Sequence, residues 1–159
     1  MKYQIRKRGF TQKAVAEKLG ISNQSLGERL KDGKDIAVLS IGPIGVEAEK
    51  AISIAELRSL NDNPAAPLEI AHYDMRFLKP IDEDILHEVG RKFKKVVTVE
   101  DGVISGGLGS AVLEFFADHG YEVEVKRVGI PNKFVMHGTV AELRRICGMD
   151  AQSIAEILI

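Results

Sequence analysis

Residues 94–116, KKVVTVEDGVISGGLGSAVLEFF, form the stretch that decides the fold. A run rich in valine (95–100) ends in two acidic residues and is followed by a glycine cluster and an apolar segment. Valine and threonine favour a strand, whereas apolar residues at helical spacing favour a helix. The stretch therefore predicts a buried strand joined through glycines to a helix, the unit from which parallel sheets are built.

The same alternation of strand and helix patterns extends over the chain from Asp35 onward. We expect strands at 36–42, 68–74, 95–100 and 121–130, and helices at 45–60, 81–93 and from the glycine cluster to about 118. The last of these strands alternates polar and apolar residues, which indicates an edge or half-exposed strand. These patterns predict an α/β fold.

Capping residues mark the starts of three helices, of which the last two are short and lie in the C-terminal part of the chain. Asp82 is expected to cap the helix over 81–93, and Thr139 with Glu142 three residues later forms a capping box. A final short helix is expected to begin near Asp150.

Composition limits the function classes. The chain has 159 residues, 45% of them hydrophobic, which suffices for a packed core. No stretch is long and apolar enough to predict a membrane span or a secretory signal. The single Cys147 excludes an internal disulfide and fits a cytoplasmic location.

Charge divides the chain into two unlike parts. Residues 1–34 hold nine Lys or Arg and three Asp or Glu, a net of +6, while the remainder holds 13 and 20, a net of −7. The basic part would suit contact with nucleic acid, whereas the acidic part argues against it.

The glycine cluster fails as a dinucleotide fingerprint. Val112 stands where the third glycine of G-x-G-x-x-G belongs, and Arg127 stands where an acid would bind the ribose. Histidines and the cysteine fall on different predicted elements without ligand spacing, so no metal site is predicted.

Two interpretations remain open for the residues around the cluster. Glu100 and Asp101 could act as an acid/base pair. Alternatively they could cap the following turn, an interpretation favoured by the fact that neighbouring residues on a strand point to opposite faces. The glycines could leave free N–H groups that bind an anion, or let the helix start close to a partner chain. The candidate anion-binding or interface residues are Glu100, Asp101, Gly106, Gly107, Gly109 and Ser110.

Four stretches resemble one enzyme family in order and spacing. They are IAVLSIGPIG (36–45), HYDMRFLKPIDED (72–84), KKVVTVEDGVISGGLGSAVLEFFADHGY (94–121) and VKRVGIPNKFVMHGTVAELRRICGMDAQSI (125–154). Together they resemble the C-terminal, transketolase C-terminal-like domain of the 1-deoxy-D-xylulose-5-phosphate synthase family. The strand with VEDG and GGLGSAV is shared with transketolases and pyruvate dehydrogenase β-subunits, and YDMRFLKPID and GIPNKFVMHGT narrow the match to the synthases.

The resemblance implies a three-layer fold with about five strands, mainly parallel with one antiparallel edge strand. It also implies a transferase that uses thiamine diphosphate and Mg²⁺ to join pyruvate to glyceraldehyde 3-phosphate in isoprenoid biosynthesis. The family's cofactor motif, which begins Gly-Asp-Gly, has no counterpart in this sequence. We therefore expect no catalytic residue, cofactor or metal in this chain and no activity from it alone. Its expected role is association, as a homodimer or with the missing synthase domains.

The N-terminal segment differs from the rest. FTQKAVAEKLGISNQSLGERL (10–30) resembles a helix-turn-helix in which Ser22, Asn23 and Gln24 would contact DNA. About 30 residues cannot form a core of their own. A recombined reading frame, an amphipathic arm packed on the acidic domain, and a DNA-binding or regulatory protein remain alternatives. We therefore divide the chain into a short helical arm (1–31) and an α/β domain (32–159).

Overall fold

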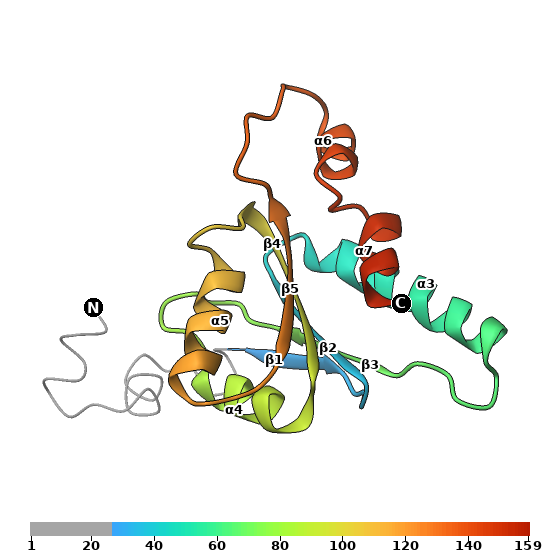
Figure 1. The fold of residues 1–159 in the computed structure, drawn as a ribbon. Coiled ribbons are helices and arrows are strands. Elements are labelled where there is room, and N and C mark those ends of the chain that lie inside the picture. The colour runs from blue at the N-terminus through green and yellow to red at the C-terminus, as the bar shows by residue number, and fades with distance from the viewer. Residues whose placement is uncertain (1–26) are drawn as a thin grey trace, which may run out of the picture.

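A computed structural model describes residues 27–159, and these form an α/β domain built on a five-stranded sheet (Figure 1). The strands are β1 (Glu28–Lys31), β2 (Ile36–Ile41), β3 (Ile70–Asp74), β4 (Lys95–Val103) and β5 (Glu124–Ile130). Their order is β1-β3-β2-β4-β5, and only the β1–β3 pair is antiparallel. The sheet of about five strands with one antiparallel edge is confirmed.

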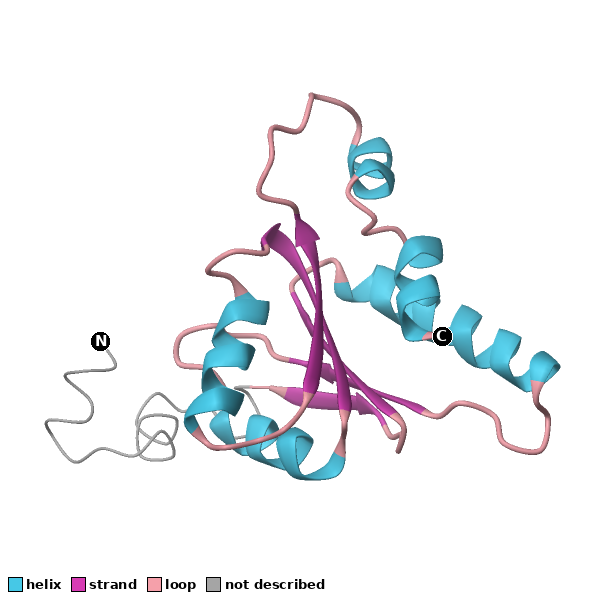
Figure 2. Ribbon diagram, viewed as in Figure 1, coloured by secondary structure: helices cyan, strands magenta, loops and turns pink. Residues whose placement is uncertain are grey.

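Helices cover both faces of this sheet (Figure 2). Helices α3 (Gly45–Asp62) and α7 (Ala151–Leu158) pack on one face, and α4 (Glu83–Lys92) and α5 (Leu108–Asp118) pack on the other. The three layers follow from strands that are buried on both sides, since β2 is buried at five of its six positions. A further helix, α6 (Val140–Ile146), stands beyond the carboxyl end of β5.

The predicted caps are confirmed. The Asp82 carboxylate accepts a hydrogen bond from the Ile85 N–H at 3.0 Å and begins α4. Thr139 and Glu142 form the reciprocal capping box of α6. Asp150 caps α7 by accepting from the Ser153 N–H.

The antiparallel edge strand lies where the sequence predicted part of the helical arm. Glu28 pairs with Asp74 and Arg29 with Tyr73, so the sheet begins before residue 32. All four residues of β1 are exposed, and no alternation of burial marks them as a strand. This strand forms because it pairs with the edge of β3, and no local sequence pattern accounts for it. The strand over 121–130, predicted as an edge, is β5 and does lie at the other edge.

Residues 1–26 of the arm lie outside the described part of the chain, and so do Ser22, Asn23 and Gln24 of the helix-turn-helix prediction. Within residues 27–159, no helix combines the length and hydropathy that crossing a membrane requires.

Candidate functional site

A buried carboxylate organises the junction between β4 and α5. Glu100 is only 4% exposed, and its two carboxylate oxygens accept the N–H groups of Leu108 at 2.8 Å and Gly109 at 3.0 Å. The N-cap residue Gly107 has no side chain with which to cap the helix. Glu100 supplies that cap from the strand, and its negative charge lies at the positive end of the helix dipole.

The glycines make room for this carboxylate. A Cβ on Gly107 would overlap the Glu100 carboxylate and lie 2.6 Å from its Cδ, although the φ of −88° suits any residue. A Cβ on Gly129 would lie 3.1 Å from the Glu100 Cγ and 2.8 Å from the Gly102 carbonyl oxygen. Glycine is therefore required here by close approach rather than by backbone conformation.

This arrangement corrects the expectation of free N–H groups at the start of α5. The amides of Leu108 and Gly109 already donate to Glu100, so a bound anion would have to displace that carboxylate. Of the two interpretations of Glu100, the structure supports the capping one. Anion binding or a partner contact at the wider cluster stays a prediction.

Gly106 and Ser110 close the turn that precedes α5. Gly106 has a φ of +82°, a conformation that favours glycine, and its N–H donates to the Ser110 hydroxyl at 2.9 Å. That hydroxyl donates to the Ile104 carbonyl at 3.2 Å, and an Arg127 N–H donates to the same carbonyl at 2.9 Å. The turn is thus held by its own hydrogen bonds.

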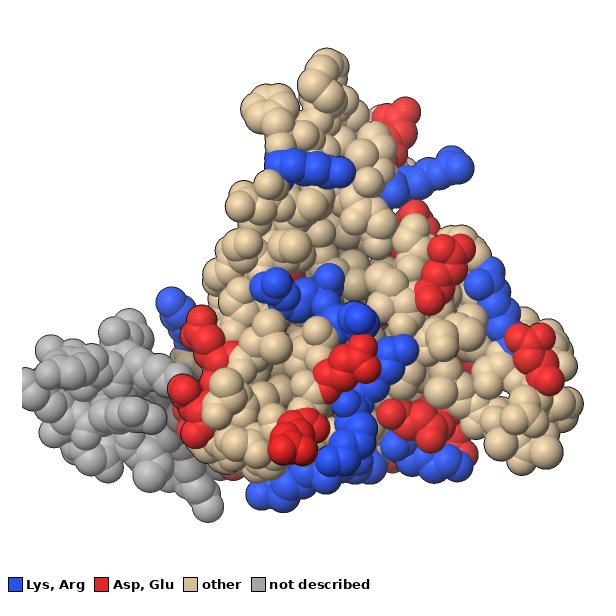
Figure 3. Space-filling view, viewed as in Figure 1, with Lys and Arg blue, Asp and Glu red and all other residues tan. Residues whose placement is uncertain are grey.

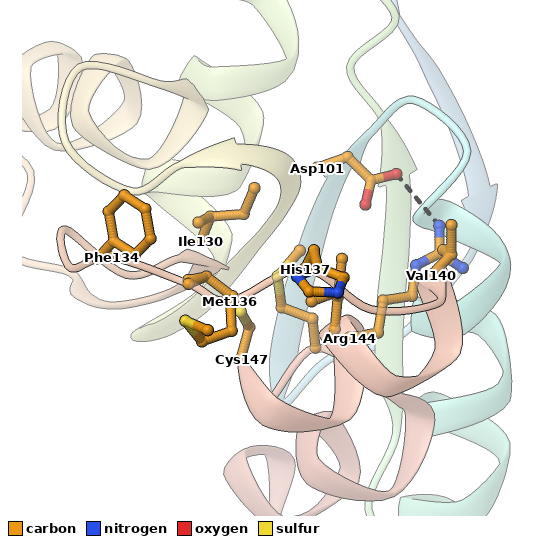
Figure 4. Close-up of a pocket in the computed structure, with 11 residues that line it drawn as sticks. Asp101, Ile130, Phe134, Met136, His137, Val140, Arg144 and Cys147 are labelled. Atoms are coloured by element: carbon orange, nitrogen blue, oxygen red, sulfur yellow. Dashed lines mark hydrogen bonds and ion pairs between the residues drawn. The ribbon is translucent and has the colours of Figure 1, made fainter.

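Asp101 serves a different element from Glu100. Its carboxylate accepts an Arg144 N–H at 3.3 Å, and a second Arg144 nitrogen lies 3.9 Å from a carboxylate oxygen of Glu47 (Figure 4). Arg144 therefore links β4, α3 and α6. The two neighbouring carboxylates thus contact different elements, Glu100 the start of α5 and Asp101 a side chain of α6.

An apolar pocket of about 560 Å³ lies beside this ion pair, between the end of β5 and α6. Figure 4 shows Met136 and Cys147 along the pocket, with Phe134 at one end and Arg144 at the other. Phe134 is 94% exposed, and α6 has no buried residue. Figure 3 shows tan side chains protruding in this region, at the top of the view. An uncovered apolar surface of this kind is typical of an interaction site.

Sequence reasoning did not identify this pocket. Its local signal is the apolar triplet 134–136 in a segment without helical or strand periodicity, followed by exposed Val140 and Ile146. The pocket itself depends on how the loop folds over α6, which no local pattern encodes.

Two histidine arrangements also emerge from the tertiary structure. The rings of His87 and His119 lie 4.8 Å apart by centroid, and the His87 Nδ1 lies 2.9 Å from the Tyr121 hydroxyl. His72 is buried between β3 and α3 with its Nε2 2.8 Å from the Ser40 hydroxyl. Burial lowers the pKa of His72 and keeps its ring neutral.

The described residues do not fit the cofactor and metal that the family resemblance implies. Among residues 27–159, no three His, Cys, Asp or Glu side chains come together as metal ligands. The large pocket is lined mainly by apolar side chains and offers no cluster of cations for a diphosphate. We therefore derive no chemical step through thiamine diphosphate or Mg²⁺ in this chain.

Comparison with known proteins relates the chain to proteins that share one type of domain. A family model described as "Transketolase, C-terminal domain" matches residues 26–154. The 1-deoxy-D-xylulose-5-phosphate synthase of Bacteroides thetaiotaomicron is 62% identical over 133 residues, and that of Phocaeicola vulgatus is 58% identical over 133 residues. Each match covers 84% of this chain and 20% of the relative, so the chain spans about a fifth of these synthases.

A solved structure shows the same fold. A protein described as a split gene transketolase, an inactive β4 tetramer, superposes with a TM-score of 0.73 and 31% sequence identity. The match covers 83% of this chain and 40% of that one.

Proposed function

The chain belongs to the transketolase C-terminal domain family, and from this premise we propose that it functions as the C-terminal domain of a 1-deoxy-D-xylulose-5-phosphate synthase. The observation that carries the proposal is the 62% identity to a synthase over 133 residues, restricted to one fifth of that enzyme. Family membership alone would fit several kinds of enzyme, because they share this domain. Sequence identity to a synthase at this level favours the synthases among them.

The activity belongs to the whole synthase in this proposal. Thiamine diphosphate, Mg²⁺ and the substrates pyruvate and glyceraldehyde 3-phosphate bind to its other domains, and this chain alone turns over nothing. The poor fit of the described residues to both cofactors supports that division. The proposed setting is the cytoplasm, in keeping with a single cysteine.

The role proposed for this chain is association, with the remaining synthase domains or with a second copy. The exposed apolar pocket beside α6 supports it, because such a surface costs free energy when it faces water. In this proposal the Glu100 cap and its glycines fix α5 in place and take no part in chemistry. The DNA-binding alternative finds no support among the relatives.

A reconstitution assay tests the proposed function. The Bacteroides thetaiotaomicron synthase is shortened by the region that this chain matches, and deoxyxylulose phosphate formation is measured with and without the added chain. We expect no product from either protein alone and product from the mixture. Product from this chain alone would overturn the predicted inactivity. If the mixture gives no product and the two proteins do not co-sediment, the assignment to this synthase role is wrong.

A further inference from the structure

We propose that His87 and His119 form a binding site for a divalent transition metal ion, Zn²⁺ above all. His87 lies on α4, and His119 is the C-cap residue of α5, the helix that packs on the same face of the sheet (Figure 1). The proposal does not depend on the function proposed above, because both histidines lie within this domain.

The first observation is the separation of the two imidazole rings. The ring centroids of His87 and His119 lie 4.8 Å apart, with the ring planes at 89°. In zinc sites the distance from metal to nitrogen is about 2.0–2.1 Å, which puts the ion about 3.2 Å from the centre of each ring. Two rings that bind one ion at an angle of about 90–109° then have centres about 4.5–5.2 Å apart. The two helices therefore already hold the rings at the separation that a shared ion requires.

The second observation is that the hydrogen bond of His119 fixes the protonation of its ring. The Nδ1 of His119 lies 2.8 Å from the carbonyl oxygen of Phe115. A carbonyl oxygen only accepts hydrogen bonds, so Nδ1 carries the proton. The Nε2 of the neutral ring then keeps the lone pair through which an imidazole binds a metal ion.

The ring of His87 offers a nitrogen in the same way. Its Nδ1 lies 2.9 Å from the Tyr121 hydroxyl, whose oxygen can accept the ring N–H. Its Nε2 has no hydrogen-bond partner among residues 27–159 and is not enclosed by protein. Histidines that bind metals typically donate their other ring N–H to a fixed oxygen, which sets the tautomer and the orientation of the ring. Both histidines have such an oxygen beside Nδ1.

The third observation is that aromatic packing restrains both rings. The His119 ring stacks on Phe115 with 4.1 Å between centroids, and the His87 ring meets Phe115 edge-on at 4.9 Å. Phe115 belongs to the buried core, and Tyr121 contacts the His87 ring from another side at 5.9 Å. Restrained side chains lose little conformational entropy when they bind an ion.

The chemistry of the two rings selects the kind of ion. Imidazole nitrogens suit Zn²⁺, Ni²⁺ and Cu²⁺, whereas Mg²⁺ prefers oxygen ligands. Within the described part of the chain no third His, Cys, Asp or Glu joins a metal-binding group, so water occupies the remaining positions around the ion. The bound ion ties α4 to α5, and this site is unrelated to the Mg²⁺ that the synthase family uses.

Calorimetric titration of the untagged 159-residue chain with Zn²⁺ tests the proposal. We expect one ion per chain, and we expect His87→Gln and His119→Gln each to raise the dissociation constant by at least ~10-fold. The matched control is His137→Gln, because His137 is an exposed histidine on the loop before α6 and should leave the dissociation constant unchanged. Titration with Mg²⁺ should give no binding heat. Zn²⁺ affinity that survives either of the first two substitutions, or that is lost in the control, refutes the site.

Nuclear magnetic resonance of the ring nitrogens in the wild-type chain avoids any effect of a substitution on folding. Zn²⁺ is expected to shift the Nε2 resonances of His87 and His119 together, complete at one equivalent, and to leave those of His72 and His137 in place. The melting temperature should rise on the order of 5 °C when free Zn²⁺ exceeds the dissociation constant 100-fold. A shift of one ring alone, or of neither, overturns the proposal.

Discussion

Removing the Glu100 carboxylate should destabilise the domain more than removing any exposed acid. The perturbation is Glu100→Ala, which deletes the acceptor of two N–H groups at the start of α5. Each buried donor left without a partner costs about 1–3 kcal/mol, and hydrogen bonds to a charged group contribute about 1.5–3 kcal/mol each. Water entering the space would recover part of this loss, so the expected loss is about 3–5 kcal/mol of the free energy of unfolding.

Glu100→Gln separates the charge from the shape of the side chain. Glutamine fills the same volume and keeps one acceptor oxygen, but it places an NH₂ group against the second N–H. The variant loses one charge-assisted hydrogen bond, but it also removes the cost of burying a charged carboxylate. The expected net loss is about 1.5–3 kcal/mol of the free energy of unfolding. The alanine variant should therefore be less stable than the glutamine variant.

Chemical denaturation followed by circular dichroism measures both variants. For a chain of this length about 3–5 kcal/mol corresponds to a fall in melting temperature on the order of 10 °C. Glu114→Ala is the matched control, because Glu114 is an exposed acid on the same helix, and its cost should stay within about 0.5 kcal/mol. If Glu100→Ala is as stable as Glu114→Ala, the carboxylate does not hold α5 and the capping argument fails.

Three further predictions concern Gly107, His72 and Asp82. Gly107→Ala should cost about 2–4 kcal/mol through collision with Glu100, and a double-mutant cycle with Glu100→Ala should show that most of this cost disappears when the carboxylate is gone. The free energy of unfolding should fall as the pH drops through 6.5, because burial lowers the pKa of His72 and the unfolded chain then binds a proton more readily than the folded chain. Denaturation at several pH values should show that this free energy falls less steeply below pH 6.5 in His72→Gln than in the wild-type chain. Asp82→Ala should cost about 1 kcal/mol by removing the N-cap of α4, and a thermal melt of unchanged midpoint would contradict this.

Local signals explain how much of the fold the sequence could predict. Asp82 and the pair Thr139 and Glu142 act within three residues of the N–H groups that they satisfy, so their spacing along the chain was sufficient. The buried strands and the helices on either side of them were likewise visible in their apolar patterns. These features need no knowledge of the tertiary structure.

The features that were missed depend on contacts between distant residues. Strand β1 exists because Glu28 and Arg29 meet Asp74 and Tyr73, more than 40 positions away along the chain. The cap by Glu100 spans eight residues across a turn, so the sequence left both of its interpretations open. The pocket forms only when the loop over 131–139 packs beside α6. The sequence of this loop has no helical or strand periodicity from which that packing could be predicted.

The two edges of the sheet restrict how copies of this chain can associate. Exposed charges line both edges, namely Glu28, Arg29 and Lys31 on β1 and Glu124, Lys126 and Arg127 on β5, and β1 also carries an irregular register. Charged side chains and an irregular register on an edge strand oppose pairing with a strand from another molecule, which is how natural sheets resist edge-to-edge aggregation. Growth into a continuous intermolecular sheet is therefore disfavoured at both ends, and a finite assembly has to form through side-chain surfaces.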